Sequence, residues 1–125
     1  MSQQTLDQKR AAHAFEAVEA TKKLKDEDKK KYGIHARKLP MRIIASGLGQ
    51  ALAFLLAKDY CPSLLKSLSH WCLHKKDKEP AEANELLLKL IHGNSEDLRR
   101  YTAEALAYLQ WLVRFVEAAG ISAEE

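Results

Sequence analysis

The residues best suited to metal chemistry are two histidines four positions apart. His70 and His74 would share one face of a helix, with Cys61 nearby in sequence, and zinc sites are built from such ligands. The glutamate of metalloprotease motifs is missing, because Trp71 follows His70. No serine or cysteine has both an identifiable base and an orienting acid close to it in sequence. We therefore expect no catalytic residue, no metal ligand and no cofactor, and a protein that is not an enzyme.

A glycine pair, Gly47-Leu48-Gly49, invites comparison with dinucleotide-binding loops. The third glycine of that fingerprint would fall at position 52, which is Leu52, and no strand is expected before it. A tight turn between two packed helices explains both glycines without a ligand, because glycine supplies backbone freedom and close approach.

The strongest chemical signal is positive charge. Residues 22–42 hold nine Lys and Arg against three Asp and Glu, although the net charge of the chain is only +3. Residues 1–58 hold twelve basic and six acidic side chains, and residues 59–125 hold eight and eleven. Rows of lysine and arginine can follow a phosphate backbone, which gives affinity without reading bases and a steep salt dependence. The candidate polyanion-binding residues are Lys22, Lys23, Lys29, Lys30, Lys31, Arg37, Lys38 and Arg42. Tyr32 is the only aromatic side chain in this stretch, which argues against readout of single-stranded bases.

Size and composition indicate how these residues are positioned. A chain of 125 residues with 46% hydrophobic side chains suits one domain, residues 1–125, with a compact core. Alanine (18) and leucine (19) greatly outnumber valine (3), isoleucine (5) and threonine (3), a balance that predicts an all-α fold. No apolar run reaches the roughly 20 residues of a membrane span. We expect a cytoplasmic protein whose two cysteines, Cys61 and Cys72, are reduced.

Caps and periodicity predict a bundle of about six helices with long first and last members. The first is expected from a capping box at Thr5 and Gln8 to about Lys31, stopped by Gly33. A second segment, residues 34–46, contains Pro40, which predicts a kink or a new start near Leu39. The apolar run Leu52 to Leu56 predicts a central segment.

The second half of the chain begins with Pro62 at the first position of a helix reaching about His74. The charged stretch 75–80 is expected to be a loop, and residues 81–92 a helix ended by Gly93 in a left-handed cap. Asn94 or Ser95 is expected to cap a last helix that reaches Gly120. Residues 121–125 are expected to be a frayed tail.

Several blocks resemble one known family. The run Lys31 to Pro40 and the run Ser46 to Leu55 resemble the small α-helical subunit of the type III-B CRISPR effector, the Cmr complex. The final helix, with Tyr101 to Leu106 and Leu109 to Phe115, looks like the C-terminal block of that family, so the likeness spans nearly the whole chain. Ser46 stands where the family often carries Asn, another small polar residue able to cap a helix.

The resemblance implies a non-catalytic subunit of an antiviral ribonucleoprotein. Copies of such a subunit repeat side by side along the effector, beside the backbone subunits that hold the CRISPR RNA, and help to form the channel for the target RNA. The implied partners are other Cmr subunits, neighbouring copies of this chain, and both RNAs. From charge alone, we expect the basic stretch to face RNA and the more acidic second half to meet neighbouring subunits.

Two other functions fit the residues less well. A helical protein–protein adaptor could present the same lysines to an acidic protein partner, and salt would weaken that contact too. A small metal-dependent enzyme would have to be built from His70 and His74.

Overall fold

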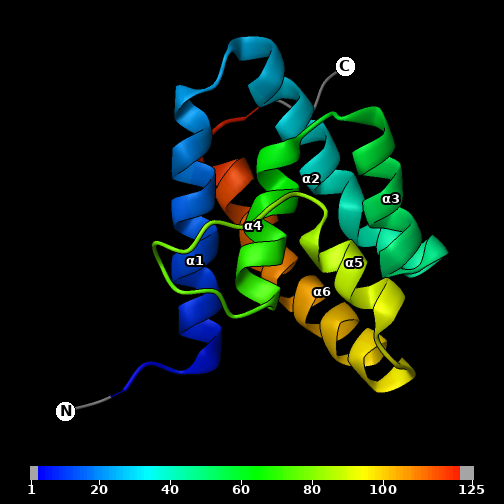
Figure 1. Cartoon of the computed structure of the whole chain (residues 1–125). Coiled ribbons are helices and arrows are strands. Elements are labelled where there is room, and N and C mark those ends of the chain that lie inside the picture. The colour runs from blue at the N-terminus through cyan, green and yellow to red at the C-terminus, as the bar shows by residue number, and fades with distance from the viewer. Residues whose placement is uncertain (1–2, 122–125) are drawn as a thin grey trace.

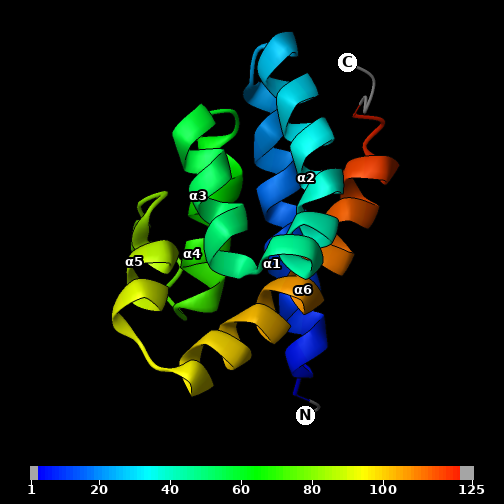
Figure 2. The same cartoon turned by 90° about the vertical axis from the view of Figure 1, so that its right-hand side faces the viewer.

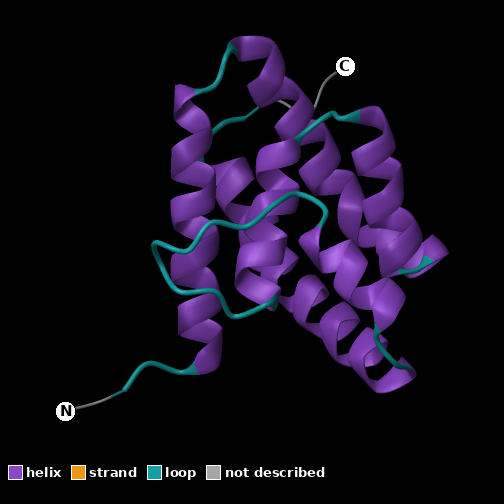
Figure 3. Cartoon of the chain, viewed as in Figure 1, coloured by secondary structure: helices purple, strands orange, loops and turns teal. Residues whose placement is uncertain are grey.

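The computed structural model describes residues 3–121, and every regular element within that range is helical (Figures 1 and 3). Its six α-helices are α1 (Leu6–Ala20), α2 (Asp26–Ser46), α3 (Leu48–Lys58), α4 (Pro62–Cys72), α5 (Glu85–His92) and α6 (Ser95–Ala118), with a short 3-10 helix at Thr21–Lys23. The predicted all-α fold of about six helices with long first and last members is confirmed. Residues 122–125, most of the predicted tail, lie outside the described residues.

The first two helices divide at a different place from the one predicted. The capping box of Thr5 and Gln8 is present, but α1 ends at Ala20 and the chain is extended at Leu24. The new start follows from Asp26, Glu27 and Asp28, whose carboxylates occupy the first turn of α2, where the helix dipole favours negative charge. Gly33, expected to stop a helix, is buried inside α2.

Other boundaries also differ from the prediction. Helix α2 continues through Pro40 to Ser46 and does not restart near Leu39, because the turns on both sides of the proline pack Leu39 and Ile43 into the core. Gly93 has an extended backbone (φ −95°), so the predicted left-handed cap there is wrong. Helix α5 begins at Glu85 rather than Ala81.

A side chain from the preceding helix supports that later start of α5. The Ser69 hydroxyl of α4 accepts a hydrogen bond from the backbone N–H of Leu86 at 3.1 Å, which satisfies one of the unpaired donors at the helix N-terminus. Pro62 occupies the start of α4 as predicted, and Asn94 forms a capping box with Asp97 at the start of α6.

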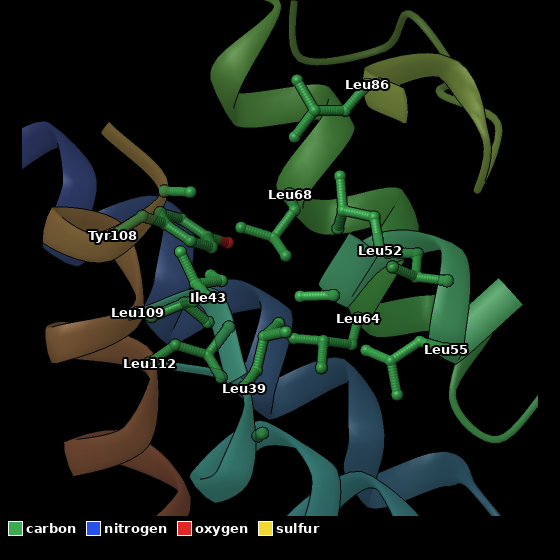
Figure 4. Close-up of a cluster of buried hydrophobic side chains, with 14 of the residues drawn as sticks. Leu39, Ile43, Leu52, Leu55, Leu64, Leu68, Leu86, Tyr108, Leu109 and Leu112 are labelled. Carbon is green, nitrogen blue, oxygen red and sulfur yellow. The ribbon is translucent and has the colours of Figure 1, made fainter. Parts of the chain in front are cut away.

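The core lies where α2, α3, α4 and α6 face one another, with α1 closing one side and α5 the end (Figures 1 and 4). Its large members are no more than 2% exposed and come from all six helices. They include Val18, Leu39, Leu52, Leu55, Leu64, Leu68, Leu86, Leu109 and Leu112. Among the glycines expected at the turn between α2 and α3, Gly47 is the one that geometry requires, because its φ of 88° is unfavourable for other residues.

Polar contacts fasten the helices at the side of the core. Glu104 of α6 accepts hydrogen bonds from the Arg10 guanidinium of α1 and, at 2.8 Å, from the Trp71 indole N–H of α4. The bonds from Arg10 and Trp71 lower the pKa of Glu104, despite its partial burial. One carboxylate thus joins three helices.

A second polar chain connects the core to the long loop before α5. Tyr108 Oη lies 2.7 Å from His13 Nδ1, His13 Nε2 lies 2.8 Å from His70 Nδ1, and His70 Nε2 lies 2.9 Å from the Lys76 carbonyl. Because that carbonyl can only accept, His70 donates to it from Nε2. When both imidazoles are neutral, His13 therefore donates to His70, and Tyr108 donates to His13.

We predict that Leu109→Ala lowers the free energy of unfolding by about 2–5 kcal/mol, because it removes a fully buried side chain and leaves a cavity. Leu98→Ala is the matched control, since it makes the same substitution on the same helix at a side chain that is 44% exposed, and it should cost less than about 1 kcal/mol. Urea unfolding of the two variants measures both values. Equal losses would contradict this description of the core.

Acidification should weaken the fold through His13. Burial, and then the charge of His70, lowers the pKa of His13 from 6.5 to about 4, while Asp77 opposes the shift. As pH falls, His13 is protonated in the unfolded chain at a higher pH than in the folded chain. The contribution of neutral His13 to the free energy of unfolding is therefore complete above pH 6.5 and is lost as pH falls toward 4. We predict that His13→Gln is less stable than wild type at neutral pH but loses less stability between about pH 7 and pH 5.

Urea unfolding at the two pH values measures this difference. His92→Gln serves as the control, because His92 is an exposed histidine at the end of α5, outside the hydrogen-bonded chain. If His13→Gln kept the full wild-type dependence on pH, His13 would not be the responsible group.

Candidate nucleic-acid interface

Six of the eight candidate cations lie on α2, and the other two lie on the 3-10 helix before it. One side of α2 is buried through Tyr32, Ala36, Leu39 and Ile43. Figure 2 views the opposite side, with α3 on one flank of α2 and α6 on the other. Because the buried residues fix the rotation of the helix, the candidate cations on α2 cannot all face the same way.

One row of cations follows the border of α2 with α3. Lys31 and Lys38 are seven residues apart and Arg42 is four further on, spacings that place all three along one side of a helix. Lys31 and Lys38 are exposed, and Arg42 is partly buried. Between Asp28 and Asp59 the sequence has no acidic residue, so the turns of α2 from Lys29 onward and all of α3 contribute only positive charge to this border.

A second group gathers at the corner between the 3-10 helix and α2. Lys22, Lys29 and Lys30 line a hollow of about 350 Å³, together with Asp26 and the chain after α6, at Ala119 to Ile121. The charge here is mixed, since Asp26 shares the hollow and the Lys22 ammonium lies 3.0 Å from a carboxylate oxygen of Glu19. Lys23 is exposed on the 3-10 helix but does not line this hollow.

Arg37 is held differently from the other candidates. Its guanidinium donates to the Ile121 carbonyl at 2.9 Å and to the Gly33 carbonyl at 3.3 Å. It also lines a groove of about 710 Å³ between α2 and α6. The structure therefore divides the candidate residues into a row beside α3, a corner group with Lys23 next to it, and an arginine bound to the Ile121 carbonyl after α6.

The groove beside Arg37 is mainly apolar. Its walls are Pro40 and Ile44 from α2 and a longer stretch of α6, with Arg114 and Asp7 among its polar residues. The α6 residues that line it are Leu106, Leu109, Gln110, Trp111, Val113 and Arg114. Ile44 is 70% exposed and Met41, on the same side of α2, is 68% exposed, which is unusual for large apolar side chains.

Tyr32, the only aromatic residue within the basic stretch of the sequence, is not the aromatic side chain that contacts the cations in the structure. Tyr32 is 1% exposed and cannot meet a base, and burial raises the pKa of its hydroxyl. The ring of Phe54 on α3 instead lies under the Arg42 guanidinium, 4.6 Å from its centre. The spacing within the basic stretch gives no indication of this pair, because α3 folds back beside α2.

The remaining candidates for chemistry are engaged or buried. His74 lies beyond the end of α4 and packs edge-on against Trp71, while His70 belongs to the hydrogen-bonded chain with His13. In the described part of the chain, no three His, Cys, Asp or Glu side chains converge as metal ligands would. Cys61 and Cys72 are free thiols, and burial raises the pKa of each to about 12, which leaves little nucleophilic thiolate.

None of the helices in residues 3–121 combines the length and apolar character needed to cross a membrane.

Two comparisons with known proteins identify the family. The family model described as "CRISPR-associated protein (Cas_Cmr5)" matches residues 6–119, a range that contains all six α-helices. The chain is also similar to the crystal structure of a CRISPR-associated Cmr5 family protein from Thermus thermophilus. The two share 28% sequence identity and a TM-score of 0.75, over 92% of this chain and 97% of that one. The chain therefore belongs to the Cmr5 family of CRISPR-associated proteins, the small subunits of the type III-B Cmr complex.

Proposed function

We propose that this subunit is non-catalytic and helps the Cmr complex to hold guide and target RNA by electrostatic attraction. The observation that carries the proposal is the row of Lys31, Lys38 and Arg42 on α2, within residues 29–58, a stretch of α2 and α3 that holds no acidic residue. Lysine and arginine in such a row neutralise phosphates without reading the bases. RNA binding of this kind contributes to antiviral defence by positioning the RNA, with no bond made or broken by this chain.

The corner group extends this basic surface. Lys22, Lys29 and Lys30 of this group lie around the N-terminal end of α2, with Lys23 next to Lys22 on the 3-10 helix, and the row of Lys31, Lys38 and Arg42 continues along α2. A single copy offers few phosphate contacts, which salt weakens strongly. Copies repeated side by side along the complex would present these contacts to one RNA together, and the effective concentration of the second contact is then high.

The groove between α2 and α6 supports a protein contact on the other border of α2. Exposed Met41 and Ile44 and the apolar wall from α6 suit a neighbouring subunit of the complex, either another Cmr protein or a second copy of this chain. The sequence leads us to expect that the basic stretch faces RNA and that the acidic second half meets neighbouring subunits, and the groove changes the second of these expectations. The part of α6 that lines the groove belongs to the more acidic second half of the chain, but the groove itself is apolar rather than acidic.

This apolar groove also favours the alternative function, a protein–protein adaptor. In that case the basic row would meet an acidic protein instead of RNA. The two functions differ in what the basic surface binds, and an experiment on cations of the corner group and the row separates them.

Reversing three charges should weaken RNA binding by the reconstituted Cmr complex. We predict that the triple variant Lys22→Glu, Lys30→Glu, Lys31→Glu reduces affinity for RNA about tenfold or more. It should also reduce the dependence of log affinity on log salt by about 2, since each single-strand phosphate contact contributes about 0.7. Filter binding across a salt series measures both quantities.

The control is the triple variant Lys66→Glu, Lys78→Glu, Lys89→Glu. It changes the net charge equally, at exposed lysines of α4, the loop before α5, and α5. Similar losses in the two variants would mean that only net charge matters. If neither variant lost affinity while binding to an acidic protein partner fell, the adaptor function would replace the proposed one.

A charged residue in the groove should impair assembly. We predict that Ile44→Asp lowers the recovery of this subunit with the Cmr complex about tenfold, because it places a carboxylate against an apolar contact. Ile91→Asp is the matched control, since Ile91 is 61% exposed on α5 and lies outside the groove. Co-purification with a tagged neighbouring subunit measures recovery. Normal recovery of Ile44→Asp would exclude the groove from the subunit interface.

A further inference from the structure

Four side chains contact one another in series at the border of α2 and α3, through a ring stack, a hydrogen bond and a cation–π contact. The ring of Tyr60 lies parallel to His35 with 4.4 Å between centres, and His35 Nδ1 lies 3.0 Å from an Arg42 guanidinium nitrogen. The Arg42 guanidinium in turn lies over the Phe54 ring. Because arginine is always charged and only donates, His35 accepts this bond on Nδ1. The guanidinium is therefore held in place, against an aromatic ring, at the end of the basic row.

A hollow of about 400 Å³ opens beside this stack. It is lined by Arg42, Ser46, Gln50, Ala51 and Phe54. Phe54 and Ala51 provide apolar surface, while the Gln50 amide and the Ser46 hydroxyl can each donate and accept hydrogen bonds. Phe54 is 40% exposed, so part of its ring faces solvent despite the arginine above it.

This combination suits a flat aromatic group with a polar edge. A nucleobase stacks on phenylalanine rings and on guanidinium planes, and its edge pairs with amides and hydroxyls. The basic row supplies the backbone contact that a base in this position needs. At 1.5 Å per helical residue, Lys31 lies about 16 Å along α2 from Arg42, with Lys38 between them.

We propose that this hollow receives an unpaired base of single-stranded RNA, stacked against Phe54 and Arg42, while the adjoining phosphates lie along Lys38 and Lys31. This inference rests on the proposed RNA-binding function and gives it one specific contact. The expectation that the basic stretch contacts phosphates alone, because its only aromatic residue is Tyr32, is revised here. Folding brings Phe54 and Tyr60 to the cations from outside the stretch.

The test uses the full chain at low salt and a short single-stranded RNA containing 2-aminopurine, whose fluorescence is quenched when the base stacks. Wild type should quench the probe. Phe54→Leu, which keeps an apolar side chain but removes the ring, should reduce quenching and weaken binding about fivefold or more, because base stacking on an aromatic ring is lost. Phe54→Trp, which keeps an aromatic ring, should retain both the quenching and the affinity of wild type. Neither variant changes a charge, so the salt dependence of binding should stay the same.

Phe15→Leu is the matched control, since Phe15 is a 48% exposed phenylalanine on α1 that packs edge-on against Phe115, away from the basic row. It should bind like wild type. A melting temperature for each variant shows that Phe54→Leu remains folded, and recovery of binding by Phe54→Trp provides a second check.

Each outcome decides between the inference and the function on which it rests. If Phe54→Leu binds and quenches like wild type while the triple variant at Lys22, Lys30 and Lys31 loses affinity, the base contact is wrong and the phosphate contact stands. If wild type neither binds the RNA nor quenches the probe in these low-salt titrations, the base contact is wrong, and the salt series with the reconstituted complex decides the phosphate contact separately. A loss for Phe54→Leu with unchanged salt dependence supports both.

Discussion

The arrangement of this subunit depends on how the apolar side of α2 is buried. Tyr32, Ala36, Leu39 and Ile43 recur every three or four residues and enter the core between α3 and α6. That contact fixes the helix about its own axis. The cations that alternate with these residues must then lie on the remaining surface of α2, some toward α3 and some toward α6. A rotation of α2 that moved them would have to expose four side chains that are no more than 2% exposed.

The two borders of α2 consequently differ in chemistry. Toward α3 the surface is basic and polar, and residues 29–58 of α2 and α3 contribute no carboxylate to it, a combination that attracts phosphate but offers little to an apolar partner. Toward α6 it is mainly apolar, and Arg37, the α2 cation that lines this groove, is already bonded to the Gly33 and Ile121 carbonyls. A helix with such borders can contact a nucleic acid and a protein at the same time, because the two contacts use different sides. The proposed function needs this property.

Local signals predict much of the fold correctly. The capping box of Thr5, the cap of Asn94 and the position of Pro62 each depend on residues within one turn, and the structure contains all three. The break between α1 and α2 is predicted at the wrong place, because the prediction relies on Gly33 as a helix end and does not use the acidic residues Asp26 to Asp28 as a helix start. A glycine ends a helix only where nothing else holds that helix, and the buried residues flanking Gly33 hold α2. Tertiary packing, which the local sequence does not reveal, decides the outcome.

The candidate interface shows the same limit. Its cations are identifiable from the sequence because they are close together in it, but their sorting into separate groups depends on where the core lies. The pair of Arg42 and Phe54 joins residues on different helices, and the order of side chains from Tyr60 to Phe54 needs the turn at Gly47 to bring α3 back along α2. The positive φ of Gly47 therefore has an indirect role at the candidate interface. It carries no functional group, yet it sets the path of the chain that places an aromatic ring beneath the last cation of the row, and so converts a simple charged helix into a surface with a defined place for a planar group.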